Sequence, residues 1–121
     1  LNNENQYIIK MAYSEILANR VREFLAKIPE IEVEEKKMFG GLAFLVNEKM
    51  CINVSDDRLM CRFDPQYTEG LTERQGYLPC IMKNKDLKGY CYVEEIGYKS
   101  AKDFAFWLNL CLDFNKKTKK K

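Results

Sequence analysis

The sequence contains no histidine, and this absence removes a large group of reaction chemistries. Without an imidazole the chain has no Ser-His-Asp triad, no Cys-His dyad and no histidine general base. The Cys-x-x-Cys spacing and the histidine ligands typical of zinc sites are missing as well. We therefore predict a protein without metal, cofactor or catalytic residues, which is not an enzyme.

Long apolar runs and phosphate-binding loops are also missing. No apolar run approaches the roughly 20 residues of a membrane-spanning helix, and the N-terminus lacks the charged-then-apolar pattern of a signal peptide. Gly40-Gly41 matches neither a Walker loop nor a dinucleotide fingerprint, so we interpret the pair as a structural turn or bulge before a strand. The sequence thus predicts no membrane contact and a cytoplasmic location.

The cysteines are odd in number and show no metal-type clustering. Most of them sit inside apolar runs, which is typical of free thiols that act as small core side chains in a reducing compartment. They are Cys51, Cys61, Cys80, Cys91 and Cys111.

Positive charge is concentrated at the C-terminus. Five lysines lie within residues 116–121, and without them 15 basic residues face 18 acidic ones, a net charge of −3. A globular nucleic-acid-binding domain usually has a strongly basic body, which this chain lacks. We interpret residues 116–121 as a solvated basic tail.

The length of 121 residues predicts one domain. We expect residues 1–10 to form an arm outside the fold, since Met11 resembles a natural start. Residues 11–115 then make up the domain. An amphipathic helix is predicted over Tyr13–Ile28, capped by Ser14 and ended by Pro29.

The middle of the chain predicts an antiparallel sheet of four to five strands. Two apolar runs, Leu42–Val46 and Met50–Val54, flank a short polar step and predict a β-hairpin. Strands are also predicted before and after it, over Val33–Phe39, Arg58–Asp64 and Gly89–Val93. In Arg58–Asp64, apolar and polar residues alternate, which predicts one buried and one solvated face.

A second helix is predicted from Ala101 to about Asn115, with Ser100 and Asp103 in a capping box. One apolar stripe of this helix covers the sheet. A second stripe, Phe106, Leu110 and Phe114, needs something else to pack against. The first helix and a partner chain are both candidates, and we predict these three residues as an interface.

Basic residues on strands and turns are candidates for contact with an anion or a nucleic acid, helped by Tyr90 and Tyr92 as stacking surfaces. The alternative interpretation is that they keep strand edges soluble. These candidates are Lys36, Lys37, Arg58, Arg62, Lys83, Lys85 and Lys88.

Several segments together resemble one known family, the N-terminal domain of TfoX/Sxy competence regulators. They include the fairly specific Lys-Met-Phe-Gly-Gly at residues 37–41, Asp-Arg-Leu-Met at 57–60 and Lys-Gly-Tyr-Cys-Tyr-Val at 88–93. The resemblance extends from Met11 to Phe114. Where relatives have a small residue or glycine after Asn47, this chain has Glu48, and its loop from Pro79 to Lys88 differs in detail.

The resemblance implies an α+β fold in which two helices flank an antiparallel sheet, similar to secretion chaperones. It implies regulation and no catalytic residues. Full-length members carry a second, helical domain, whereas we expect a stand-alone domain here. We therefore predict a non-enzymatic regulatory or adaptor domain that acts through protein contacts, with a protein partner or as a homodimer. The alternative is a transcriptional regulator that binds nucleic acid through the basic sheet face, loop and tail.

Overall fold

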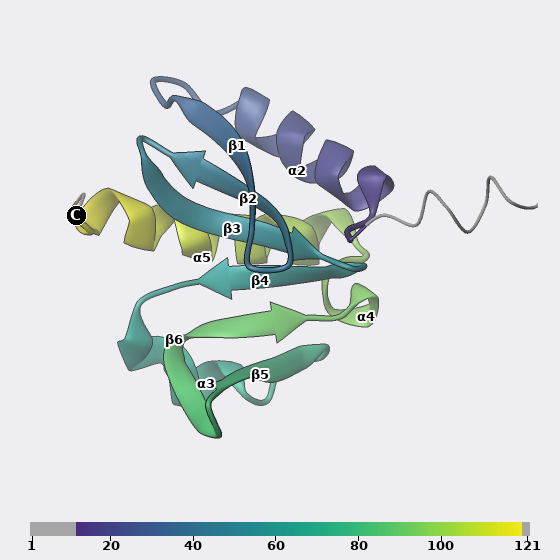
Figure 1. The fold of residues 1–121 in the computed structure, drawn as a ribbon, viewed down its shortest axis with the longest axis vertical. Helices are drawn as coiled ribbons and strands as arrows, with labels where there is room; N and C mark the ends of the chain where they lie inside the picture. Colours follow the sequence, from purple (N-terminus) through teal and green to yellow (C-terminus); the bar gives the residue numbers. More distant parts are fainter. Residues whose placement is uncertain (1–11, 120–121) are drawn as a thin grey trace, which may run out of the picture.

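A single sheet of six antiparallel strands, in the order β1-β2-β3-β4-β6-β5, forms the centre of the fold (Figure 1). The computed structural model describes residues 12–119, so the expected arm of residues 1–10 lies outside the described residues. The strands are β1 (Val33–Met38), β2 (Gly41–Val46), β3 (Lys49–Ser55), β4 (Arg58–Arg62), β5 (Tyr77–Met82) and β6 (Lys85–Val93).

Two long helices pack on one face of this sheet. They are α2 (Glu15–Ala26) and α5 (Ala101–Lys117), and three short elements complete the chain: η1 (Pro65–Tyr67), α3 (Thr68–Leu71) and α4 (Glu95–Tyr98). The predicted N-caps are confirmed, because the Ser14 hydroxyl accepts from the Leu17 N–H and the Ser100 hydroxyl from the Asp103 N–H. Since α5 runs to Lys117, the first two lysines of the predicted tail are helical.

Alternation along the strands directs one set of side chains toward the helices. Phe44, Ile52 and Leu59 are fully buried there and form one core with Val21 of α2 and Trp107 of α5. The helices also touch each other, with the Phe24 and Phe104 rings edge to face at 5.9 Å. Burial of apolar area on this face is the main favourable term that holds the sheet and the helices together.

Three of the hairpins turn through two residues that both have positive φ. The turns are Phe39-Gly40, Asn47-Glu48 and Lys83-Asn84. This backbone is the type I′ turn, whose twist matches that of paired strands. The predicted hairpin between Leu42 and Val54 is confirmed, and Gly40 lies in a turn while Gly41 opens β2.

The predicted α+β class, with one antiparallel sheet and a helix at each end of the chain, is confirmed. The sheet has six strands, one more than the upper number predicted. The addition is β5, where Pro79 argues against a strand in the sequence. Because β5 is an edge strand, its proline removes no hydrogen bond from a neighbour on the outer side.

The prediction that one face of β4 is solvated was wrong for the middle of the strand. Leu59 and Cys61 are buried as expected, but Met60 is buried too. On this second face Met60 pairs with Asn53 and Tyr92, and Asn53 is itself buried. Only the two ends of the strand, Arg58 and Arg62, are partly exposed.

The described residues, 12–119, include no helix that is both long and apolar enough to cross a membrane.

Tyr98 ties α4 to the turn after β3. Its side chain is 5% exposed, and its hydroxyl donates to the Asp57 carbonyl at 2.6 Å. Burial raises the pKa of this phenol from 10 to about 12, so the folded state favours the neutral form.

We expect this raised pKa to weaken the fold at alkaline pH. The unfolded tyrosine ionises near pH 10 and the folded one near 12, so about 2 kcal/mol of stability present below pH 10 is lost as the pH rises through 12. Urea unfolding from pH 9 to 12 should show this loss. In Tyr98→Phe that part of the pH dependence should be absent, and equal slopes in the two proteins would contradict the assignment.

Candidate functional site

A groove runs along α5 on the side that faces η1 and α3. The predicted interface residues Phe106, Leu110 and Phe114 are all half-buried and line it. It consists of two adjoining hollows of about 350 and 340 Å³, which share Tyr67 and Leu110. We call this feature, lined by Asp64, Gln66, Tyr67, Gly70, Leu71, Phe106, Leu110, Asp113, Phe114, Lys116 and Lys117, the α5 groove.

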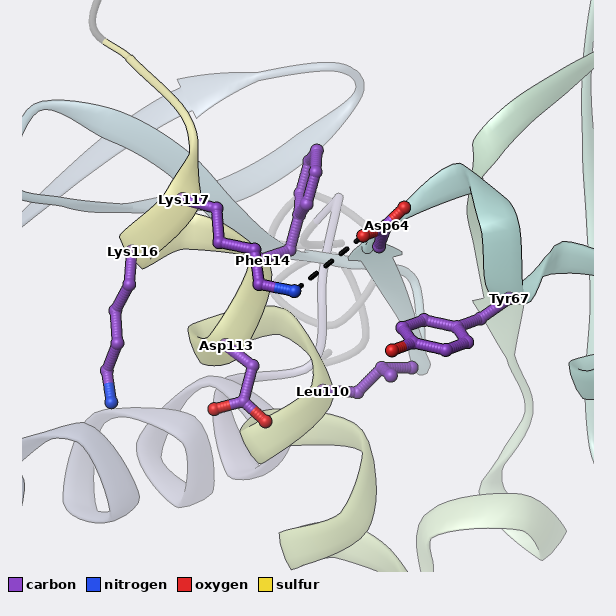
Figure 2. Close-up of a pocket in the computed structure, with 7 residues that line it drawn as sticks. All are labelled: Asp64, Tyr67, Leu110, Asp113, Phe114, Lys116 and Lys117. Carbon is purple, nitrogen blue, oxygen red and sulfur yellow. Dashed lines mark ion pairs between the residues drawn. The ribbon is translucent and has the colours of Figure 1, made fainter.

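The middle of the α5 groove is apolar. Leu110 projects from α5 toward the ring of Tyr67, as Figure 2 shows, and Tyr67 is 46% exposed. Phe106 and Leu71 extend the apolar lining in the direction of the helix N-terminus. Half-exposed large side chains that line a hollow are what an apolar segment of another molecule needs for burial.

Charged residues mark the two ends of the groove. At the C-terminal end the Lys117 ammonium lies 3.8 Å from the Asp64 carboxylate, the contact dashed in Figure 2. At the N-terminal end the Arg74 guanidinium lies 3.6 Å above the Phe106 ring and 3.6 Å from the Asp103 carboxylate. Both pairs are partly solvated, so each contributes little to stability but sets the sign of the local charge.

The wall opposite α5 is fixed by local capping at Asp64. Its carboxylate accepts from the Gln66 N–H at 3.1 Å and from the Gln66 side-chain amide at 3.0 Å. These hydrogen bonds, with the charge of Lys117, lower the pKa of Asp64. Pro65 then begins η1, and the turn presents Tyr67 to the groove.

The helix side of the groove is anchored at both ends. The Trp107 indole N–H donates to the Gly97 carbonyl at 3.0 Å, which joins α5 to α4. The Lys49 ammonium donates to the carbonyls of Asn115 at 2.5 Å and Thr118 at 2.8 Å. These orphan carbonyls at the helix C-terminus are thereby satisfied, so the groove lies on a rigid element.

The structure separates the seven basic candidates. Lys36 and Lys37 lie on edge strand β1, whereas Lys83 and Lys85 lie at the hairpin to the opposite edge strand, β5. Lys88 is exposed on β6.

The two arginines of this set are already engaged with other groups. Arg58 stacks on the Tyr92 ring at 4.1 Å. Arg62 reaches the Met50 carbonyl at 3.5 Å and lies over the Phe114 ring at 5.4 Å. Arg62 therefore supports the α5 groove from behind Phe114.

The cysteines are free and buried. Burial raises the pKa of the Cys51 and Cys61 thiols well above the usual range, and Cys91 and Cys111 beside Cys61 raise it further. These thiols are protonated and unreactive at neutral pH. Within the described part of the chain, no three His, Cys, Asp or Glu side chains are grouped in a way that could hold a metal ion.

The sequence predicts the α5 side of the groove but not the opposite wall. Tyr67, Leu71 and Arg74 lie in a glycine-interrupted segment that carries no periodic pattern. The signal available was Asp64-Pro65, an N-cap followed by a proline at the first helical position.

Comparison with known proteins gives one family match. The TfoX N-terminal domain matches residues 23–115, which include β1 to β6 and most of α5. No curated protein matches the chain. The match covers most of the chain and includes both walls of the α5 groove.

Proposed function

Because the chain belongs to the TfoX N-terminal domain family, we propose that it is a regulatory binding domain without catalytic activity, which receives an apolar segment of a protein in the α5 groove. The family identifies the domain as competence-regulator-like. The observation that carries the proposal is the row of Phe106, Leu110 and Phe114, half-buried beside two adjoining hollows of about 350 and 340 Å³.

The pattern of this surface supports a protein as the bound molecule. Interfaces concentrate their binding energy in a few large apolar or aromatic side chains at the centre, surrounded by polar and charged residues. The α5 groove has Leu110 and Tyr67 at its centre and the pairs Asp64–Lys117 and Arg74–Asp103 at its ends. Both signs of charge are present, which suits a polypeptide better than a polyanion.

The same surface argues against catalysis. Catalytic groups need a pKa near the working pH and a place beside the substrate. The thiols are buried, and burial raises the pKa values of Cys51, Cys61 and Cys80, while the carboxylate of Asp64 has a lowered pKa and stays ionised. The proposal therefore assigns the groove binding alone.

The nucleic-acid alternative draws on the stack of Arg58 over Tyr92. Aromatic rings and guanidinium groups on a sheet face do bind single strands. However, the lysines of this set lie in two separate groups, on β1 at one edge of the sheet and on β6 and its turn near the other, and the charge of the body is negative. We favour the protein-binding proposal for this reason.

Site-specific photo-crosslinking in the source organism tests the proposal. Benzoylphenylalanine in place of Leu110 or Phe106 should give the same discrete protein adduct. The matched control is Glu23, which is exposed on the other long helix, and this position should give none. The purified adduct partner should bind the wild-type domain directly, and Leu110→Glu should weaken that binding at least ~30-fold, as at a central interface residue. Equal adducts from positions 110 and 23 would contradict the proposal.

A further inference from the structure

Five side chains of α5 are placed symmetrically about the groove residue Leu110. Phe106 and Phe114 lie four residues to either side of it, and Asp103 and Lys117 lie seven residues to either side. At 3.6 residues per turn, all five project within about 40° of the direction of Leu110. Along the helix this stripe is acidic, aromatic, aliphatic, aromatic and basic, and all of its members except Asp103 line the groove.

This order is complementary to itself when reversed. If a second copy of α5 lies antiparallel on the first with a two-fold axis at Leu110, Leu110 meets Leu110 and Phe106 meets Phe114. Asp103 then meets Lys117, which has the opposite charge. The spacing of three, four, four and three residues keeps these five side chains on one face of the helix. A two-fold interface requires this kind of self-complementarity.

The structure leaves these residues available for such a contact. Phe106, Leu110 and Phe114 are half-buried, and the Lys117 side chain is 60% exposed. Asp103 already pairs with Arg74 and Lys117 already pairs with Asp64. In the dimer, the Arg74–Asp103 pair of one copy would meet the Asp64–Lys117 pair of the other. Each end of the interface would then contain two carboxylates and two cations, so its charges balance. Asp113 and Lys116 also line the groove, outside this stripe.

We propose that the occupant of the α5 groove is a second copy of this chain, with α5 packed antiparallel on its counterpart about a two-fold axis at Leu110. The inference rests on the proposed function in so far as both use the groove for protein contact. It adds the identity of the occupant and the residue-by-residue pairing.

Cross-linking with a short bismaleimide tests the geometry. The wild-type protein provides the background, because its cysteines are buried. Leu110→Cys should cross-link to itself, because it lies on the axis. Phe106→Cys should cross-link only when mixed with Phe114→Cys. A parallel pairing would instead cross-link Phe106→Cys to itself and would overturn the proposal.

Sedimentation equilibrium of the whole chain tests the association. The wild type should be a dimer, and Leu110→Glu should raise the dissociation constant at least ~30-fold, because two carboxylates would meet on the axis. Asp103→Lys and Lys117→Asp should each weaken the dimer by about tenfold. The double variant should restore it, and Lys27→Asp, the matched charge reversal at an exposed position outside the groove, should leave it unchanged.

The outcomes separate this inference from the proposed function. A folded wild-type monomer, with unfolding midpoints unchanged in the variants, overturns the dimer. If position 110 still gives a discrete adduct with another protein, the groove remains the binding surface. If position 110 gives no adduct and the chain is monomeric, both proposals fail.

Discussion

Replacing Gly41 with alanine is expected to lower the free energy of unfolding by about 3 kcal/mol or more, the upper end for overpacked sites. A Cβ at this position would lie 2.0 Å from the Val54 carbonyl oxygen and 2.7 Å from the Asn53 Oδ1. The first contact is with the backbone of the neighbouring strand, which cannot rotate away. Strands β2 and β3 would have to separate where their pairing begins.

Two other glycines provide matched controls for this experiment. Gly40 has φ +71° and open space around it, so Gly40→Ala should cost only the backbone strain of about 1 kcal/mol. Gly70 in α3 also has open space, and Gly70→Ala should raise stability by about 0.5–1 kcal/mol. Urea unfolding of the three variants gives the comparison. If Gly41→Ala loses no more than Gly40→Ala, the strands can yield and the close approach is not what demands glycine.

Local patterns in the sequence were enough to predict most of the fold. The spacing of Leu17, Val21 and Leu25 predicts a helix because only one face has to be buried, and the structure buries all three. Ser14 and Ser100 predict helix starts because their hydroxyls can satisfy free N–H groups. Each of these signals lies within a few residues, so no knowledge of the rest of the chain is needed.

The parts that were missed depend on distant residues. Met60 is flanked by Arg58 and Arg62 in the sequence, and only the arrangement of neighbouring strands explains its burial. Pro79 is compatible with a strand only because β5 ends up at the edge of the sheet. Both outcomes are set by tertiary neighbours that a window along the chain does not contain.

The candidate site divides in the same way. The second apolar stripe on α5 could be predicted to need a cover, because a helix with two apolar faces is unusual. Its surroundings could not be predicted, since η1 and α3 lie about forty residues earlier in the chain and show no stripe of their own. The stripe on α5 therefore predicted one wall of the site. The opposite wall, with Tyr67 and Asp64, completes the hollow and could not be predicted.

Substitution of Asn53 is the second change that is expected to have a large effect on stability. It acts on the hairpin that contains Gly41. Its side chain is fully buried, and its amide Nδ2 donates to the Met38 carbonyl at 2.9 Å, where β1 ends. Its Oδ1 is buried without a hydrogen-bond partner among the described residues. The amide N–H thus holds the β1–β2 turn to β3, and only a donor at that position can do so.

Asn53→Asp should lower the free energy of unfolding by about 3–5 kcal/mol at pH 7, because it buries an unpaired carboxylate against the Met38 carbonyl. Burial should raise the pKa of the new carboxyl above its unfolded value. The protonated acid can donate to Met38, so the loss should be small near pH 4 and should grow as the pH rises. Asn109→Asp, the same change at an exposed position of α5, should stay within about 0.5 kcal/mol. Urea unfolding of both variants between pH 4 and 7 decides, since an equally small loss at both positions would mean that the Asn53 amide does not hold the hairpin.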